Sequence, residues 1–323
     1  MREALFIKKN KERWERLQDS PPADADDMAK DFIRLVDDLA YAKTFYSTSK
    51  VTQFVNSLAA RFYLNIYQNR KEESSRLVSF WKFDLPLTIH RHYKIIIFTF
   101  LLFAIFFAVG FFSAKSDELF VRQVLGNDYV DMTEKNIEEG NPFGVYQSGS
   151  AFLTWMGIMI NNIIVSFMYF VKGIFFGILT ISSIVKEAIR IGAFEQFFFV
   201  RGMGLQSILT VFIHGTLEIA AIIFAGAAGI VMGTSFLFPG THNRLDALKK
   251  GTKDGVKIVI GLVPIFIIAA FFEGYVTRHY KMPIILSISI LLISLAFLIG
   301  YFIIYPIKLS RRLALENKQE AIG

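Results

Sequence analysis

The chain has 323 residues, of which 53% are hydrophobic and 34 are Phe, and its mean hydropathy is +0.43. Soluble domains usually contain about 45–50% apolar residues, so this composition predicts an integral membrane protein. The chain contains no cysteine, which excludes disulfides, cysteine-ligated zinc and thiol nucleophiles. The net charge is +7, and in membrane proteins such an excess of basic residues usually lies in cytoplasmic loops beside anionic lipid. Because the sequence contains no nucleic-acid-binding motif, we expect no nucleic-acid partner.

Residues 1–94 predict a cytoplasmic helical region. The chain begins with charged residues rather than with the apolar segment of a secretory signal peptide, so we expect the N-terminus to stay in the cytoplasm. Apolar side chains recur at helical spacing at Met28, Phe32 and Leu35, and again over residues 50–68. Such helices can pack on one another, present a docking surface to a partner, or do both.

Within this region, residues 77–94 predict an interfacial segment that leads into the first span. Trp81 lies among basic residues there, a mixture typical of the membrane surface. We expect His90 and His92 to face lipid headgroups rather than a metal ion.

Residues 95–305 predict a transmembrane bundle. It begins with an unbroken apolar run over residues 95–112, which is long enough to cross a bilayer. Residues 113–150 are polar and rich in Asp and Glu, which indicates an extracytoplasmic loop. The second span covers residues 151–170.

The next segment leaves two topologies open. In the first, residues 173–185 cross the membrane a third time, and the charged residues after them lie outside. In the second, which the positive-inside rule favours, residues 173–200 lie in the interface and residues 206–236 form a re-entrant hairpin.

Basic residues further along the chain decide between these topologies. Residues 244–257 form a strongly basic loop and the tail over residues 306–323 is also basic, so we expect both in the cytoplasm. Two clear spans, residues 256–272 and 283–305, lie between them. We therefore favour an all-α bundle of about six spans with a short half-helix at residues 206–213, and five spans are the alternative.

Ionisable and polar side chains inside the predicted spans mark the candidate functional site. His214 and Glu218 are spaced i and i+4, so they lie on one helix face. Ionisable groups in a membrane are costly unless they pair or meet water, and they commonly serve function. The six-span topology brings Glu273 to the same depth, so we expect these three within hydrogen-bond or one-water reach. Asn161 and Asn162 are expected either to join neighbouring helices or to line a polar cavity.

Small residues follow this site on the same segment. Gly226, Gly229 and Gly233 form a face that predicts close helix packing, with a pore or ligand groove as the alternative.

The stretch IHGTLEIAAIIFAGAAGIVMG, residues 213–233, resembles the HG-x-x-E signature of the stage II sporulation protein M family. Glu273 and Thr277 are similar to the late E-x-x-x-T motif of that family. Asn161 and Asn162 resemble the paired Asn of its second hydrophobic segment. By resemblance, the polar cluster of this chain comprises His214, Glu218, Glu273, Asn161 and Asn162.

The sequence around Trp14 also resembles the N-terminal helices of the family, so the resemblance covers nearly the whole chain. The family's namesake works in endospore engulfment, in a membrane complex with peptidoglycan-degrading partners. The resemblance therefore implies a membrane anchor or scaffold. It does not imply sporulation, because most relatives occur in organisms that form no spores.

Three functions fit the sequence. The first is a membrane scaffold in which His214, Glu218 and Glu273 form a structural cluster. The second is a transporter or channel component in which these groups line a polar path. The third is an intramembrane metal-dependent hydrolase, which we favour least because the chain contains no HExxH motif.

We therefore expect a multi-pass protein of the inner, cytoplasmic membrane with both termini in the cytoplasm. We expect the lipid bilayer and proteins of the membrane or envelope as partners, and the sequence is also compatible with a homo-oligomer. No cofactor and no bound metal are expected, and an enzymatic activity is not favoured.

Overall fold

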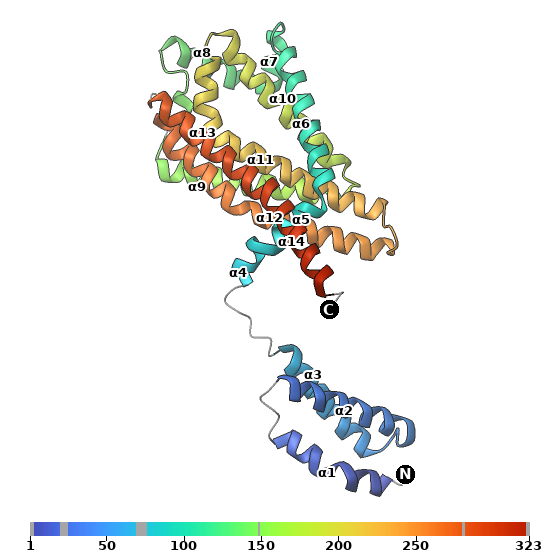
Figure 1. Cartoon of the computed structure of the whole chain (residues 1–323). Helices are drawn as coiled ribbons and strands as arrows, with labels where there is room; N and C mark the ends of the chain where they lie inside the picture. Colours follow the sequence, from blue (N-terminus) through green and yellow to red (C-terminus); the bar gives the residue numbers. More distant parts are fainter. Residues whose placement is uncertain (1–2, 20–24, 69–75, 148, 280–281, 321–323) are drawn as a thin grey trace. The chain divides into compact units, whose positions relative to one another are not determined.

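The computed structural model describes residues 3–19, 25–68, 76–147, 149–279 and 282–320. These residues form helices joined by turns, and no strand is found among them. The chain divides into two compact units, Met1–Leu77 and Val78–Gly323 (Figure 1). The all-α prediction is confirmed. The division between the units falls at the start of residues 77–94, the segment predicted to be interfacial.

The first unit consists of three amphipathic helices, α1 (Glu3–Asp19), α2 (Ala25–Phe45) and α3 (Lys50–Gln68). Its apolar core contains Leu35 and Phe62, which are fully buried. The buried Trp14 ring donates a hydrogen bond from Nε1 to Asp38 Oδ2 at 2.8 Å, which ties α1 to α2. This unit therefore has a core of its own.

The second unit begins with the segment predicted to be interfacial, which comprises α4 (Arg76–Ser79), the π-helical turn η1 (Phe80–Asp84) and α5 (Leu85–Arg91). Leu85 and Ile89 are buried in the core of this unit. His92 Nε2 lies 2.9 Å from Asp254 Oδ2, and Arg91 donates a hydrogen bond to the same oxygen. The expectation that His92 faces headgroups is therefore wrong, because it pairs with a carboxylate.

Long apolar helices form most of the second unit. Within the described residues, five helical stretches are long and apolar enough to cross a membrane, which makes the chain a multi-pass membrane protein. They are built on α6 (Tyr93–Ser113), α9 (Ala151–Val171), α11 (Gly204–Leu237), α12 (Arg244–Phe271) and α13 (Ile284–Ile299). The last continues through η6 (Gly300–Ile304) into α14 (Tyr305–Glu320).

A further long helix, α10 (Ile178–Val200), packs between α6 and α11. It is less apolar than the others because it carries Lys186, Glu187, Arg190 and Glu195. Its backbone lies close to α6, since a Cβ at Gly192 would be 2.1 Å from the Phe107 carbonyl oxygen. The segment predicted as a third crossing, residues 173–185, is therefore not one helix, because the chain turns after η3 (Lys172–Ile174) and α10 begins only at Ile178.

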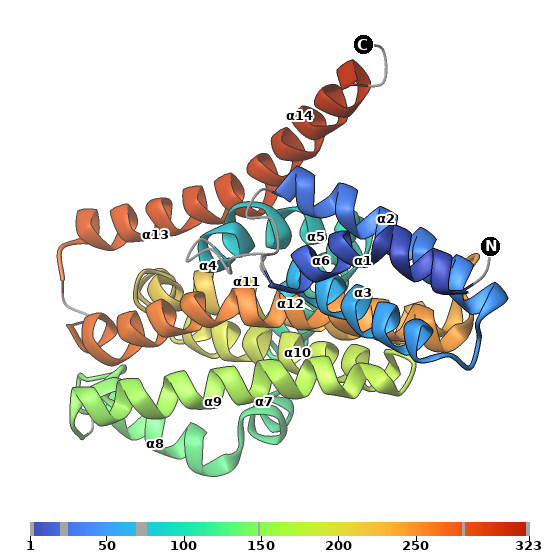
Figure 2. The same ribbon diagram turned by 90° about the horizontal axis from the view of Figure 1, so that it is seen from below.

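The central helix is α11, which contacts α9, α10, α12 and α13 (Figure 2). It is continuous over its 34 residues. The predicted half-helix at residues 206–213 and the alternative re-entrant hairpin over residues 206–236 are therefore both wrong. The glycines of α11 do not break the helix, because they let neighbouring backbone approach, as Gly229 does beside the Tyr169 carbonyl oxygen.

The loop between α6 and α9 is folded. It contains α7 (Glu118–Leu125), α8 (Asn127–Glu138) and η2 (Gly144–Gln147). Val130 and Phe143 from this loop are buried in a cluster with Phe197 and Phe198 from α10. The loop therefore covers the end of the bundle at which α10 finishes and α11 starts.

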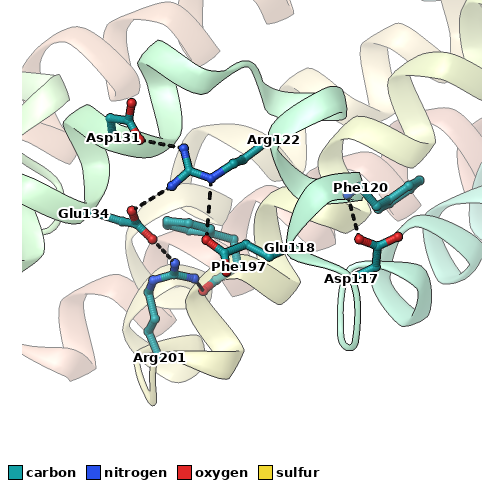
Figure 3. Close-up of polar contacts among 8 residues, drawn as sticks. All are labelled: Asp117, Glu118, Phe120, Arg122, Asp131, Glu134, Phe197 and Arg201. Atoms are coloured by element: carbon teal, nitrogen blue, oxygen red, sulfur yellow. Dashed lines mark hydrogen bonds and ion pairs between the residues drawn. The ribbon is translucent and has the colours of Figure 1, made fainter.

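A polar network fixes this loop in place (Figure 3). Arg122 of α7 donates hydrogen bonds to Asp131 Oδ1 at 2.5 Å and Glu134 Oε2 at 3.2 Å. The other oxygen of Glu134 pairs with Arg201, just after α10, and the Arg201 guanidinium lies 3.6 Å above the Phe197 ring. Glu134 thus connects both arginines and joins α7 and α8 to the end of α10.

Candidate functional site

A cavity of about 540 Å³ lies among α9, α10, α11, the turn after α12 and the folded loop. Nine of its lining residues are polar, namely Tyr129, Tyr146, Asn161, Asn162, Glu187, Arg190, His214, Glu218 and Glu273. All five residues named as the polar cluster from the sequence therefore line one cavity.

His214 is held in one orientation by a chain of hydrogen bonds. It is only 4% exposed, and its Nδ1 lies 3.0 Å from Thr277 Oγ1. The Thr277 hydroxyl also lies 3.1 Å from the Phe272 carbonyl oxygen, and when it donates its single proton to that oxygen it accepts a hydrogen bond from His214. In that arrangement His214 carries its proton on Nδ1, and the lone pair of a neutral ring is on Nε2.

Glu273 faces that lone pair from a different segment. It lies in the π-helical turn η4 (Phe272–Val276), which continues α12. Its Oε2 is 4.0 Å from His214 Nε2. Such π-turns are rare and frequently occur at functional sites. Here the turn carries both Glu273 and the carbonyl that orients Thr277.

Glu218 completes a compact cluster one helical turn after His214. One ligand atom from each of His214, Glu218 and Glu273 lies within 4.8 Å of the others. The predicted proximity of these three groups is therefore present in the structure. Two carboxylates at this separation repel each other unless a proton or another cation lies between them.

Asn161 and Asn162 lie on α9 at the wall of the same cavity. Asn162 is 8% exposed, and its side chain approaches the Glu218 carboxylate of α11, although Nδ2 forms no hydrogen bond of good geometry among the described residues. Both predicted roles of this Asn, a link between helices and a part of the cavity wall, therefore stay predictions.

The sequence did not assign four polar residues of the cavity. Glu187 and Arg190 form an ion pair on α10, and the Tyr169 hydroxyl donates a hydrogen bond to Glu187. Charged residues within an apolar segment are the available signal for this pair, but the same pattern also predicts the outer end of a span. Tyr129 and Tyr146 come from the folded loop and carry no comparable signal in the sequence.

Tyr129 and Tyr146 are the polar residues that the folded loop contributes to the cavity wall. Burial raises the pKa of Tyr129 to about 12 and that of Tyr146 well above its usual value, so both hydroxyls stay protonated. The Tyr146 ring packs edge-to-face against His214 with 5.8 Å between ring centroids. The loop thus contributes directly to the surroundings of His214.

Comparison with known families places the chain. A family model described as Stage II sporulation protein M matches residues 99–278, which is more than half of the chain and includes the whole polar cluster. A second model, described as a domain of unknown function (DUF8413), matches residues 4–68. Comparisons with curated proteins and with solved structures gave no significant match. The chain belongs to the stage II sporulation protein M family.

Proposed function

We propose that this protein is a membrane scaffold that recruits a protein partner through its N-terminal unit. The observation that carries this proposal is the separate apolar core of Met1–Leu77, a unit that is also matched by its own family model. A unit of this kind in the same chain as a multi-pass bundle is suited to binding a partner outside the bilayer.

A stripe on α2 is the proposed docking surface. Ala29, Ile33, Val36 and Ala40 follow one another at helical spacing and are all exposed, with Ile33 at 61%. Leu35, on the other side of the helix, is buried in the core of the unit. An exposed apolar stripe opposite a buried one favours a partner that contributes a complementary apolar surface.

The proposed topology puts this unit and the C-terminus on the cytoplasmic side of the inner membrane. Basic residues between α11 and α12 and in α14 support this orientation by the positive-inside rule. Single cysteines at Ser20 and Ser310 of this cysteine-free chain should resist an impermeant thiol reagent in intact cells. Labelling of either cysteine would contradict the proposed topology.

The scaffold proposal is tested by purifying the full chain from its native membrane with bound proteins. Wild type and a control Leu5→Asp variant, which changes an exposed residue of α1, should retain the same specific partner. An Ile33→Asp/Val36→Asp variant should lose it while folding normally. Retention by this variant, or no specific partner for wild type, would count against the scaffold.

A transport or channel role is the second candidate, and the polar cavity favours it. A purely structural cluster would fill its space with paired groups, whereas this one borders a cavity of about 540 Å³. Flux of cations or protons across liposomes containing the purified protein, abolished in Glu218→Gln, would support transport. Equal flux in protein-free liposomes would exclude it for those ions.

A further inference from the structure

We infer that His214, Glu218 and Glu273 form a binding site for a divalent transition-metal ion, with an open coordination position toward the cavity. The inference does not depend on the scaffold role, because it concerns only the membrane unit. It rests on the convergence of donors, the orientation of His214, the charge of the cluster and the free space beside it.

The donor atoms come from two helices that meet at this point. His214 and Glu218 project from one face of α11, and Glu273 approaches from η4. An ion equidistant from three atoms 4.8 Å apart would lie about 2.8 Å from each, compared with about 2.0–2.2 Å in zinc sites. Side-chain movements of less than about 1 Å would close this gap.

The tautomer of His214 is the one that a metal requires. Its Nδ1 proton is engaged by Thr277, which leaves the Nε2 lone pair directed toward Glu273. Histidine ligands in metal sites commonly donate their second ring N–H to a fixed acceptor in this way. Thr277 is therefore a positioning residue, and its own proton is committed to the Phe272 carbonyl.

The charge of the cluster also favours a divalent ion. Neutral His214 with two ionised carboxylates carries a net charge of −2 in surroundings that are largely apolar. The adjacent Arg190 does not compensate it, because Arg190 pairs with Glu187. One divalent cation would neutralise both carboxylates and convert their repulsion into ligation. Imidazole together with carboxylates favours Zn²⁺ or Mn²⁺ over Ca²⁺ or Mg²⁺.

The cavity leaves room for a fourth ligand. Three protein ligands and one open position are typical of zinc sites that bind a water or a substrate. The Asn162 amide lies on the same cavity wall beside Glu218, so it can donate a hydrogen bond to a carboxylate or another oxygen ligand of the metal.

The direct test is Zn²⁺ binding to the full-length, tag-free protein in detergent. Wild type should retain one Zn²⁺ ion per chain after dialysis, and His214→Gln and Glu273→Gln should each retain none. Glu195→Gln is the matched control, because Glu195 is a buried carboxylate of α10 that does not line the cavity. The control should bind Zn²⁺ as wild type does.

Substitutions of Thr277 distinguish a role in orienting His214 from a role in packing alone. Thr277→Val should weaken Zn²⁺ affinity by about 10–100-fold, and Thr277→Ser, which keeps the hydroxyl, should restore it. Unchanged affinity in Thr277→Val would contradict the assigned orientation of His214.

Co²⁺ gives a measurement that needs no variant, in case the substitutions prevent folding. Bound to wild type, it should show the strong visible absorption of a four- or five-coordinate ion, and Zn²⁺ should displace it. Failure of wild type to bind Zn²⁺ or Co²⁺, or equal Zn²⁺ binding by wild type and the folded His214→Gln and Glu273→Gln variants, would overturn the site. In that case a shared proton would balance the two carboxylates.

Discussion

The two halves of α11 use small residues for opposite purposes. In the half that carries His214, a Cβ added at Gly215 would meet nothing closer than 3.9 Å, and the helix borders the cavity. In the other half, a Cβ at Gly233 would lie 2.2 Å from the Gly177 backbone nitrogen, and one at Gly229 would lie 2.5 Å from the Tyr169 carbonyl oxygen. The half with His214 therefore borders a cavity, whereas the half with Gly229 and Gly233 is packed directly against neighbouring backbone.

This difference separates the support of the site from the site itself. Backbone-to-backbone packing around Gly229 and Gly233 fixes α11 against the end of α9 and the turn between α9 and α10. A rigid helix is then able to hold ionisable side chains beside a cavity without collapse of the surrounding apolar groups. Substitutions in the packed half should therefore act on stability, and substitutions in the open half should act on function.

The largest effect is expected for Gly233→Ala in the packed half. Its added methyl group would clash with the backbone near Gly177, which cannot move as a flexible side chain can. Overpacking of a core usually lowers the free energy of unfolding by about 1–3 kcal/mol, and we expect Gly233→Ala to reach or exceed the upper end of this range. Thermal unfolding in detergent measures it. A melting temperature equal to that of wild type would contradict the tight contact.

The next effect is expected in the open half, at Glu218. Glu218→Leu removes a polar group from the cavity wall that Glu218 shares with His214 and Asn162. Buried polar groups that lose a polar neighbour are destabilising, so the free energy of unfolding should fall by on the order of 1–2 kcal/mol. Glu218→Gln keeps the size and hydrogen-bonding capacity, so its melting temperature should be close to that of wild type.

Function in cells then distinguishes the roles of this carboxylate. A scaffold should tolerate Glu218→Gln better than Glu218→Leu in a complementation assay. Complete inactivity of Glu218→Gln at unchanged melting temperature would count against the structural interpretation of the cluster and would favour ion binding or transport.

A smaller effect is expected at the loop that covers the open half. Arg201→Leu breaks the pair with Glu134 and weakens the attachment of the loop shown in Figure 3. Both side chains are partly exposed, so the loss should be about 1 kcal/mol or less and should shrink with salt. Faster proteolysis within residues 113–150 is the readout. Lys115→Leu, which changes an exposed lysine of the same loop, should not accelerate it.

Much of this fold could be predicted from the sequence because apolar runs and helical periodicity report burial directly. The N-terminal helices and the long membrane helices follow from these patterns. The continuity of α11 could not be predicted, because glycine-rich sequence is equally compatible with a break and with close packing. Only the neighbours of Gly229 and Gly233 decide that, and they come from distant segments.

The candidate site was predictable in its ionisable core and not in its surroundings. His214 and Glu218 are evident because their spacing puts two ionisable groups on one face of an apolar helix. Thr277 has no such signal apart from the family motif, since its role depends on a hydrogen bond across 63 residues of sequence. Tyr129 and Tyr146 approach the cavity only because the loop folds back over the bundle.

The smallest effect is expected for Gly215→Ala, which is the counterpart of Gly233→Ala in the open half. The nearest heavy atoms to its Cβ belong to Ile219 and Val211, both at ordinary contact distance, so no clash opposes the substitution. Alanine is favoured over glycine within a helix by roughly 0.5–1 kcal/mol, and the variant should therefore be as stable as wild type or slightly more stable. Because Gly215 lines the cavity next to His214, the added methyl group should nevertheless reduce the space available to a ligand there. A stabilised protein with weaker ligand binding would support the division of α11 into a packed half and an open half. A destabilisation as large as that of Gly233→Ala would show instead that both halves are packed.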